Sequence, residues 1–313
     1  WTPRRRPAPA RFHHRVRQSL FPGDAGNPLD LSRIGSRGRV GSCGVGFGAT
    51  SKRHHDDHLC LFAGDLFNPN VLQKKLQEIR VYYREKFQKA TQFNFDHFKH
   101  DDEDQQLHAY VEELAVLVSN GIIEMVEERS ILKSPQWSSH IYEGAQGILL
   151  DKGFGNRPYV TQSNTTSKNA LELIKKNTDI SINDISLYYV TRSYLTRHGS
   201  GPFSKFPSDY VLRNTETETN IYNHYQGEFK RGYLDISLMN YAIRSDETFS
   251  QGASKNLLIT CLDQLPTEKM YFSSDGKICR VEFPDFHKKL PFKFDSVLHS
   301  FHPCSDTMYK LVL

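Results

Sequence analysis

Long apolar runs are absent from this sequence of 313 residues. Its densest apolar stretches are broken by Glu, Asp or Thr before they reach the roughly 18–20 residues that a transmembrane helix requires. This absence excludes a protein that crosses a membrane by helices. A composition of 38% hydrophobic and 24% charged residues is instead typical of a soluble globular protein with one large or two modest domains.

Cysteine is also scarce, and the chain does not start with a secretory signal. The five cysteines are odd in number, widely spaced and without a CxxC pair: Cys43, Cys60, Cys261, Cys279 and Cys304. A disulfide scaffold and a cysteine-type zinc site are therefore not expected, and no metal ligand is assigned. The predicted location is a reducing compartment, the cytoplasm.

Basic residues do not exceed acidic ones after the first 40 positions. Residues 1–40 contain nine Arg against two acidic residues, a net charge of +7, whereas residues 41–313 contain 31 basic against 34 acidic residues, a net charge of −3. A nucleic-acid-binding groove needs basic side chains distributed along the fold. We therefore expect no nucleic-acid partner for the body of the protein.

Residues 1–33 form an Arg-rich arm whose composition differs from the remainder. The arm is rich in Arg, Pro, Ala and His, the remainder is richer in Lys, and the chain starts with Trp1 rather than Met. Three interpretations are open: a targeting peptide, a disordered basic tail, or the remnant of an upstream coding segment that was truncated or misread. We favour the third, because the change in composition is abrupt and an initiator Met is missing.

Three stretches before residue 100 have more than one interpretation. Six glycines within 34–50 would let backbone amides approach an anion, but a flexible loop is the alternative because no complete nucleotide-binding glycine motif is present. The run from His54 to His58 is interpreted as a solvated loop, since five adjacent ligands do not converge on one metal ion. The aromatic residues within 71–99 are more typical of helix packing than of stacking on bases.

The pattern of apolar residues predicts an α/β fold. Apolar side chains from Leu107 to Val118 recur at helical spacing behind an acidic run that begins at Asp101, and Gly121 marks the expected end. Further elements are expected as helices at 169–176 and 235–244, strands at 140–142, 186–194 and 257–261, and a hairpin at 270–283 that turns at Asp275-Gly276. Alternating strands and helices predict a mixed, largely parallel central sheet flanked by helices.

Residues 141–166 have the most informative sequence, IYEGAQGILLDKGFGNRPYVTQSNTT. The expected strand ends at Glu143, and small neighbours leave room for a ligand at Gln146, whose carboxamide both donates and accepts hydrogen bonds. The cluster from Thr161 to Thr166 offers hydroxyls and backbone amides to an anion such as a phosphate. These residues indicate a nucleotide or sugar-phosphate site, with ordinary turns and helix caps as the alternative.

This segment resembles the adenylosuccinate synthetase family, which has EGAQGxLLD followed by PYVTSSNTT. Four further segments are similar to family motifs in the same order: 41–48 with 64–66, 194–203, 232–235 and 258–263. The resemblance therefore implies a domain over residues 34–313. It also implies a P-loop NTPase-like fold that lacks its first strand and its phosphate loop.

The resemblance implies a GTP-dependent ligase that joins L-aspartate to IMP. GTP first phosphorylates the 6-oxygen of IMP, and the aspartate amine then displaces that phosphate. The implied contacts are Gln146 with hypoxanthine; Thr161, Ser42 and Cys43 with the 5′-phosphate; Lys230 and Arg231 with aspartate; and Asp263 with guanine. Asp263 is alternatively a strand-end residue that caps a helix. Mg²⁺ as cofactor and a homodimer are also implied.

Several positions depart from the family pattern and leave alternatives open. Val45 replaces an Arg, Cys261 replaces the Lys of TKLD, and Lys230 and Arg231 are the only cations left in the aspartate-binding loop. The stretch TNIYNHYQGEFKRGYLD at 219–235 is more similar to a shorter, divergent archaeal and phage branch, some of whose members use dGMP to make 2-aminoadenylosuccinate. The choice between IMP and dGMP, the choice between GTP and ATP, and a non-catalytic nucleotide-binding remnant all stay open.

The family's opening segments, a GDEGKGK loop with the proposed catalytic Asp and a GGxNxGH segment with an assisting His, have no counterpart here. Gly23-Asp24-Ala25-Gly26 lacks the lysine, so the chain is interpreted as truncated at its N-terminus and its catalytic base is not assigned.

We expect the chain as printed not to form adenylosuccinate, because phosphoryl transfer needs a lysine-bearing loop, Mg²⁺ and a base. Loss of one preorganised donor alone costs roughly 10²–10³ in rate. The measurement is an assay with GTP, Mg²⁺, aspartate and IMP or dGMP. Turnover near about one per second would contradict this expectation, and would indicate that Lys52 and Arg53 serve the phosphate instead.

Overall fold

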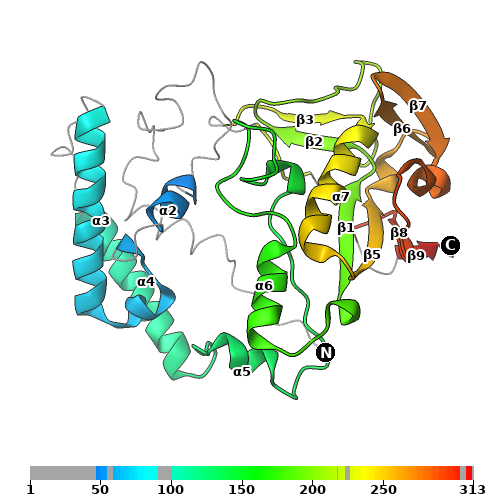
Figure 1. The fold of residues 1–313 in the computed structure, drawn as a ribbon. Coiled ribbons are helices and arrows are strands. Elements are labelled where there is room, and N and C mark those ends of the chain that lie inside the picture. Colours follow the sequence, from blue (N-terminus) through cyan, green and yellow to red (C-terminus); the bar gives the residue numbers. More distant parts are fainter. Residues whose placement is uncertain are drawn as a thin grey trace. The chain divides into compact units, whose positions relative to one another are not determined.

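The computed structural model describes residues 47–54, 59–90, 101–216, 218–222, 226–303 and 308–311. The chain divides into two compact units, Trp1–Glu127 (unit 1) and Glu128–Leu313 (unit 2). Figure 1 shows helices in the described part of unit 1, and strands alternating with helices in unit 2. None of the described helices is long and apolar enough to cross a membrane.

The described part of unit 1 is helical. Its elements are α2 (Phe47–Arg53), the 3-10 helix η2 (Ala63–Phe67), α3 (Pro69–Ala90) and α4 (Asp101–Ser119). Leu72, Leu76 and Ile79 of α3 recur at helical spacing and pack in one buried cluster with Leu107 of α4. The predicted helix at 101–121 is confirmed, and the chain leaves it through Gly121, whose φ of 65° is the left-handed conformation that commonly follows a helix.

The burial of Tyr83 and Arg53 bears on two interpretations of the sequence, base stacking by the aromatic residues within 71–99 and a phosphate contact by Arg53. Tyr83 of α3 is buried in the helical cluster, which confirms helix packing for this member of the aromatic stretch. Arg53 is also buried, and its guanidinium donates to the carbonyl of Leu59. Arg53 is therefore part of the interior of unit 1. The remaining aromatic residues at 93, 95 and 98 and most of the 54–58 run lie outside the described residues.

Unit 2 contains the strands. Its elements are α5 (Glu128–Leu132), η4 (Ile148–Leu150), α6 (Lys168–Asn177), η5 (Ile182–Asp184), β1 (Ser186–Arg192), β2 (Leu195–His198), β3 (Phe229–Gly232), β4 (Leu234–Asp235), α7 (Ile236–Ser250), β5 (Ser254–Thr260), η6 (Leu262–Gln264), β6 (Lys269–Ser274), β7 (Lys277–Glu282), η7 (Phe283–Lys289), β8 (Ser296–Ser300) and β9 (Met308–Leu311).

The main sheet of unit 2 has the strand order β1-β5-β8-β9. Its first three strands are parallel, and β9 is antiparallel to β8. A smaller sheet joins β4, β6 and β7, and β2 pairs with β3 in an antiparallel ribbon. The predicted architecture, a mixed and largely parallel sheet flanked by helices, is therefore confirmed.

Helix α7 covers one face of the main sheet (Figure 1). Its apolar side chains Ile236 and Ile243 join a buried cluster with Leu257 and Ile259 of β5 and Val297 of β8. The helix begins where the sequence predicts and continues to Ser250, six residues beyond the predicted end. The carboxylate of Asp235 caps it by accepting from the amide of Leu238 at 2.9 Å.

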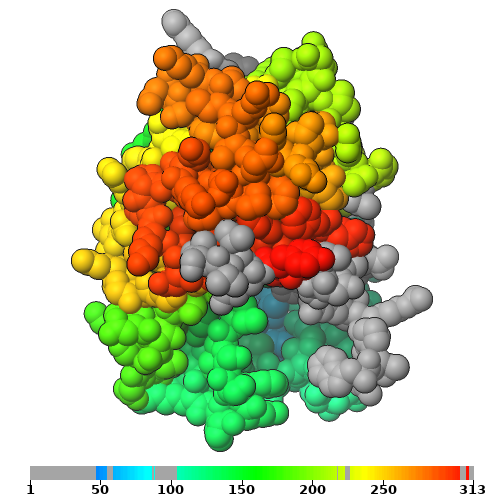
Figure 2. Space-filling view, turned by 90° about the vertical axis from the view of Figure 1, so that its right-hand side faces the viewer, coloured from blue at the N-terminus to red at the C-terminus, as the bar shows by residue number. Residues whose placement is uncertain are grey.

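The hairpin of β6 and β7 confirms the predicted turn. Asp275 and Gly276 both have positive φ, 50° and 75°, which is the requirement of a two-residue type I′ turn. Figure 2 shows the face of unit 2 on which this hairpin (orange) and the C-terminal strand β9 (red) are exposed. The turn is a local feature, since Asp-Gly fixes it without distant contacts.

The strand predicted at 140–142 is wrong. These residues form no strand, and Ile141 is 95% exposed. An apolar β-branched residue favours extended backbone, but a strand is stable only where a neighbouring strand satisfies its amides and carbonyls. Among the described residues, none pairs with 140–142. The segment therefore runs as irregular chain into η4.

Ile259→Ala should lower the free energy of unfolding by about 2–5 kcal/mol, because this side chain is fully buried against α7 and leaves a cavity. Ile278→Ala on β7 is the matched control, since Ile278 is 51% exposed and its loss should cost less than about 1 kcal/mol. Urea unfolding followed by circular dichroism measures both. Equal losses would show that the core does not lie between α7 and β5.

Candidate functional site

The carboxylate of Asp151 organises the segment 147–166. Asp151 is 1% exposed, and its two oxygens accept from the amides of Gly153 at 2.7 Å, Phe154 at 3.1 Å and Thr165 at 2.6 Å. Burial by itself would raise the pKa of Asp151, but these amides outweigh it and the pKa lies below its usual value. The two ends of the segment are thus held together by one buried charge.

Thr161, one residue predicted to bind a nucleoside monophosphate, belongs to this organised segment, and Gln146, the other, directly precedes it. The amide of Thr161 donates to the carbonyl of Leu150 at 2.7 Å. The hydroxyl of Thr165 donates to the carbonyl of Gly147 at 2.9 Å, directly after Gln146. Gln146 has a φ of 66°, and its side chain is exposed. Its carboxamide is therefore accessible to a ligand.

The amides of the Thr and Ser cluster are largely used within the protein. Those of Thr161 and Thr165 are bonded as described, and that of Ser167 donates to the carboxylate of Asp246 at 2.6 Å. The hydroxyls of Thr166 and Ser167 are buried and have no hydrogen-bond partner among the described residues.

Asp246 connects the segment to the sheet. This buried carboxylate on α7 also accepts from the hydroxyl of Tyr189 on β1 at 2.9 Å. Burial raises the pKa of Tyr189, so its hydroxyl stays protonated as a donor. The start of α6, the helix α7 and the strand β1 thus share one hydrogen-bonded centre.

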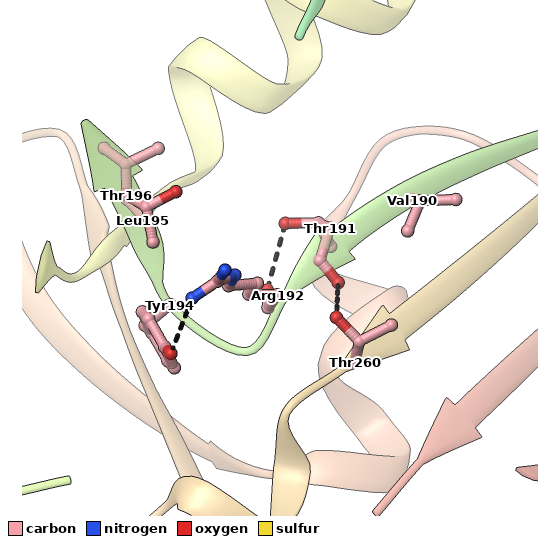
Figure 3. A pocket seen from close by; sticks show the side chains of 7 residues that line it. All are labelled: Val190, Thr191, Arg192, Tyr194, Leu195, Thr196 and Thr260. Carbon is pink, nitrogen blue, oxygen red and sulfur yellow. Dashed lines mark hydrogen bonds between the residues drawn. The ribbon is translucent and has the colours of Figure 1, made fainter. Parts of the chain in front are cut away.

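A cavity of about 340 Å³ lies where β1 and β5 end. Figure 3 shows the side chains that line it: Val190, Thr191, Arg192, Tyr194, Leu195, Thr196 and Thr260. The carboxyl ends of parallel strands are the usual place for ligands in α/β proteins. The turn after β1 is fixed there, because Ser193 donates from its amide to Thr260 and from its hydroxyl to Cys261, both at 2.8 Å.

Arg192 is the charged side chain of this cavity. Its Nη1 donates to the hydroxyl of Tyr194 at 3.1 Å and to the carboxylate of Glu218. Glu218 also accepts from the amide of Asn220 at 3.0 Å and from its carboxamide at 2.6 Å. Burial would raise the pKa of Glu218, but Arg192 and Asn220 together lower it to about 2. Glu218 is therefore ionised at neutral pH.

Lys230 and Arg231, the residues predicted to bind aspartate, lie on β3 opposite Arg197 and Thr196 of β2. Lys230 donates to the carbonyl of Gly199 at 2.6 Å. The guanidinium of Arg231 lies 5.7 Å from the centre of the Phe229 ring, and its buried Nε has no partner among the described residues. Arg231 thus retains a free donor at this end of the sheet.

Arg197 links the predicted monophosphate segment to the β2–β3 ribbon. Its Nε donates to the carbonyl of Ser200 at 2.8 Å, and its Nη2 to the carbonyl of Tyr159 at 3.4 Å. Its guanidinium also lies 5.8 Å from the centre of the Tyr159 ring. Burial lowers the pKa of Arg197. Tyr159 precedes Thr161 by two residues, so Arg197 ties Thr161 to the ribbon that carries Lys230.

Asp263, the residue predicted to bind guanine, lies within η6 after β5. The carboxamide of Asn214 donates to the backbone carbonyl of Asp263 at 3.2 Å and approaches its carboxylate at 3.5 Å. Gln264 donates to the carbonyl of Asn214 and accepts from the hydroxyl of Tyr194. Asp263 therefore connects through hydrogen bonds to the wall of the cavity. The cap position of η6 is Cys261 rather than Asp263.

Some predicted positions cannot be placed. Ser42 and Cys43 lie outside the described residues, as does the arm at 1–33. In the part of the chain that the structure describes, no group of three His, Cys, Asp or Glu side chains could hold a metal ion.

Sequence reasoning missed Arg192, Glu218 and Asp246. Arg192 and Glu218 are 26 positions apart, and no spacing rule links them. Asp246 is one acidic residue within a helix, where an exposed position is the ordinary expectation. A weak signal existed for Arg192 alone, because it lies near the end of the predicted strand at 186–194.

Comparison with known proteins identifies relatives. Residues 29–295 match the family model described as adenylosuccinate synthetase. Adenylosuccinate synthetases of Bdellovibrio bacteriovorus and Azotobacter vinelandii are 31% and 29% identical over 222 and 271 residues, which cover 69% and 82% of this chain. The matched regions cover 48% and 57% of those two proteins. The chain thus spans about half the length of the curated relatives that it matches.

Asp151→Asn should lower the free energy of unfolding by about 1.5–3 kcal/mol at neutral pH, because a neutral amide replaces the charged acceptor of several backbone amides. The contribution of Asp151 is fully present above the unfolded-chain pKa of about 3.9 and is lost as the pH falls through the lower folded-state pKa. The difference between wild type and variant should therefore shrink in acid.

Asp179→Asn is the matched control for this prediction, since Asp179 is an exposed carboxylate paired with Lys133. Chemical unfolding at pH 7 and at pH 3 measures both variants. A loss for Asp151→Asn no larger than that for Asp179→Asn would contradict the organising role of Asp151.

Proposed function

The chain belongs to the adenylosuccinate synthetase family, and from that premise we propose that it serves the GTP-dependent joining of L-aspartate to IMP. The observation that carries the proposal is the segment 147–166, in which the family motif is folded around Asp151 and leaves Gln146 exposed. The hypoxanthine ring of IMP contains an amide-like group, which needs a neutral partner that both donates and accepts hydrogen bonds. The carboxamide of Gln146 meets this requirement.

The nucleoside monophosphate is proposed to bind along this segment. Gln146 would hydrogen-bond the hypoxanthine of IMP, and Thr161 would contact the 5′-phosphate. Ser42 and Cys43 would complete the phosphate contacts. One observation supports this assignment: Arg197 links the segment to β2 through the carbonyl of Tyr159.

L-Aspartate is proposed to bind at the β2–β3 ribbon. Its carboxylates need cationic donors, and Lys230 and Arg231 are adjacent cations on β3. A guanidinium such as that of Arg231 is suited to a carboxylate, because its planar N–H donors bind one through two parallel hydrogen bonds. A bound aspartate would then present its amine toward the purine.

GTP is proposed as the phosphate donor. The carboxylate of Asp263 would accept from N1–H and the 2-amino group of guanine, a pair of donors that adenine lacks. Asn214 already donates to the backbone carbonyl of Asp263 and leaves the carboxylate partly exposed. This arrangement supports guanine over adenine as the base of the donor nucleotide.

Mg²⁺ is the cofactor that the proposed reaction implies. The described residues do not fit a protein-made cage for it, since they contain no cluster of three suitable side chains. Mg²⁺ commonly binds through nucleotide phosphates with one or two carboxylates, and none of the described carboxylates is assigned to it. When bound, the ion would neutralise charge on the transferred phosphate.

We also propose a homodimer and a cytoplasmic location. The dimer follows from the family alone. The location is supported by the scattered cysteines, which fit a reducing compartment where free nucleotides and aspartate occur.

Gln146→Ala should weaken IMP binding about two- to tenfold, which corresponds to the loss of roughly 0.5–1.5 kcal/mol for one neutral hydrogen bond. Because Gln146 is exposed, the fold should be unaffected. Titration calorimetry with IMP and with dGMP measures the effect and shows which purine the chain prefers.

Gln106→Ala, an exposed Gln on α4, is the matched control and should leave both affinities unchanged. Unchanged affinity for both nucleotides in Gln146→Ala would remove Gln146 from the site. Binding of neither nucleotide by the wild-type chain would overturn the proposed function.

A further inference from the structure

The guanidinium of Arg192 is ion-paired with the carboxylate of Glu218 beside the cavity at the end of β1. We infer that Arg192 is a further carboxylate-binding residue of the site, and that Glu218 occupies it in the absence of substrate. This inference rests on the proposed function, because it takes L-aspartate as the ligand. Arg192 belongs to none of the motifs that indicated the family.

The surroundings of Arg192 hold its guanidinium in one place. It lies 5.7 Å from the ring centres of both Tyr194 and Phe229, and Nη1 donates to the hydroxyl of Tyr194 at 3.1 Å. Two aromatic rings and a hydroxyl thus position the group before any ligand arrives. A preorganised, planar guanidinium is suited to a carboxylate, which it binds through two parallel hydrogen bonds.

The partner of Arg192 in this structure is itself a carboxylate. The side chain of Glu218 is 8% exposed, that of Arg192 is 29% exposed, and the two are ion-paired. Among the described residues, the side chain of Glu218 also accepts from its near neighbour Asn220, and its amide donates to the carbonyl of Thr215. These contacts come from Arg192 and from a short segment outside the strands, so Glu218 can leave Arg192 without breaking the sheet.

The balance of charge around Phe229 favours an added anion. Arg231 and Arg192 each lie 5.7 Å from the ring centre of Phe229, and Arg192 also donates to the hydroxyl of Tyr194. Glu218 neutralises only one of these two cations. The buried Nε of Arg231 still lacks a partner among the described residues. Two cations beside one resident carboxylate match a ligand that brings two carboxylates of its own.

L-Aspartate is such a ligand. One of its carboxylates would bind Arg231, and the other would take the place of Glu218 on Arg192. Glu218 therefore competes with the substrate and sets the affinity of the site. It also excludes ligands with one carboxylate, because these cannot offset the loss of the Arg192–Glu218 ion pair.

The test compares L-aspartate binding to the wild-type chain and to Glu218→Gln, by titration calorimetry in the presence of IMP. Removal of the competing charge should tighten aspartate binding about tenfold. The double variant Glu218→Gln with Arg192→Gln should lose this gain, because the added carboxylate then finds no guanidinium. Glu247→Gln is the matched control, since Glu247 is paired with Lys255 at 2.8 Å on other elements.

The possible outcomes separate this inference from the proposed function. Unchanged or weaker aspartate binding in Glu218→Gln, with a fold that circular dichroism shows to be intact, overturns the inference. A gain that persists in the double variant also overturns it. Binding of IMP by the same preparations tests the proposed function independently, so loss of aspartate binding alone leaves the monophosphate site standing.

Discussion

The buried carboxylate of Asp151 is the interaction on which the arrangement of unit 2 around the site depends. A charge in the interior is tolerated only when hydrogen bonds replace its water, and here backbone amides from both ends of the segment 147–166 do so. A further bond, from the hydroxyl of Thr165 to the carbonyl of Gly147, holds the residue after Gln146 beside the Thr cluster. A second buried carboxylate, Asp246, then fixes that segment to α7 and β1. Two charges thus position residues that no regular secondary structure would hold.

The parallel pairing of β1 and β5 supplies the other half of the arrangement. Parallel strands end on the same edge of a sheet, so the turn after β1 and the 3-10 helix after β5 necessarily lie together. Ser193 locks them through the carbonyls of Thr260 and Cys261. Tyr194 and Gln264 extend the contact toward Asp263. The predicted guanine contact and the cavity are therefore parts of one hydrogen-bonded edge.

Sequence reasoning succeeded where local rules decide the structure. The apolar spacing of α4, the Asp-Gly turn of the hairpin and the capped start of α7 each depend on neighbours within a few residues. It failed at 140–142, because a strand also needs a partner, and a sequence pattern does not supply one. The motif at 141–166 indicated a nucleotide site, which stays a prediction, and the role of Asp151 as the organiser of this segment became visible only with its amide contacts.

The site residues also divide into those that the sequence indicated and those that only the folded chain shows. Gln146, Thr161, Lys230, Arg231 and Asp263 came from motifs, and their roles stay predictions, as do those of Ser42 and Cys43, which lie outside the described residues. Arg192 and Glu218 came from geometry. Their pairing joins β1 to a segment 26 positions later, across intervening turns whose path no periodicity predicts. A long-range ion pair of this kind is accessible only from the folded chain.

The cost of burying a guanidinium explains why such a pair is there. A guanidinium that is half-buried without a counter-ion destabilises the fold, since desolvation is not repaid. Arg197 meets this constraint with carbonyls, and Lys230 does the same, so neither cation depends on a carboxylate of the protein. Arg192 has no such carbonyl partner among its described contacts and is balanced by Glu218 instead. A carbonyl does not compete with a substrate carboxylate as a full charge does. A cation paired with a carbonyl is therefore available to a substrate carboxylate, whereas a cation paired with a carboxylate must exchange that carboxylate for the substrate's. Arg192 is of the second kind.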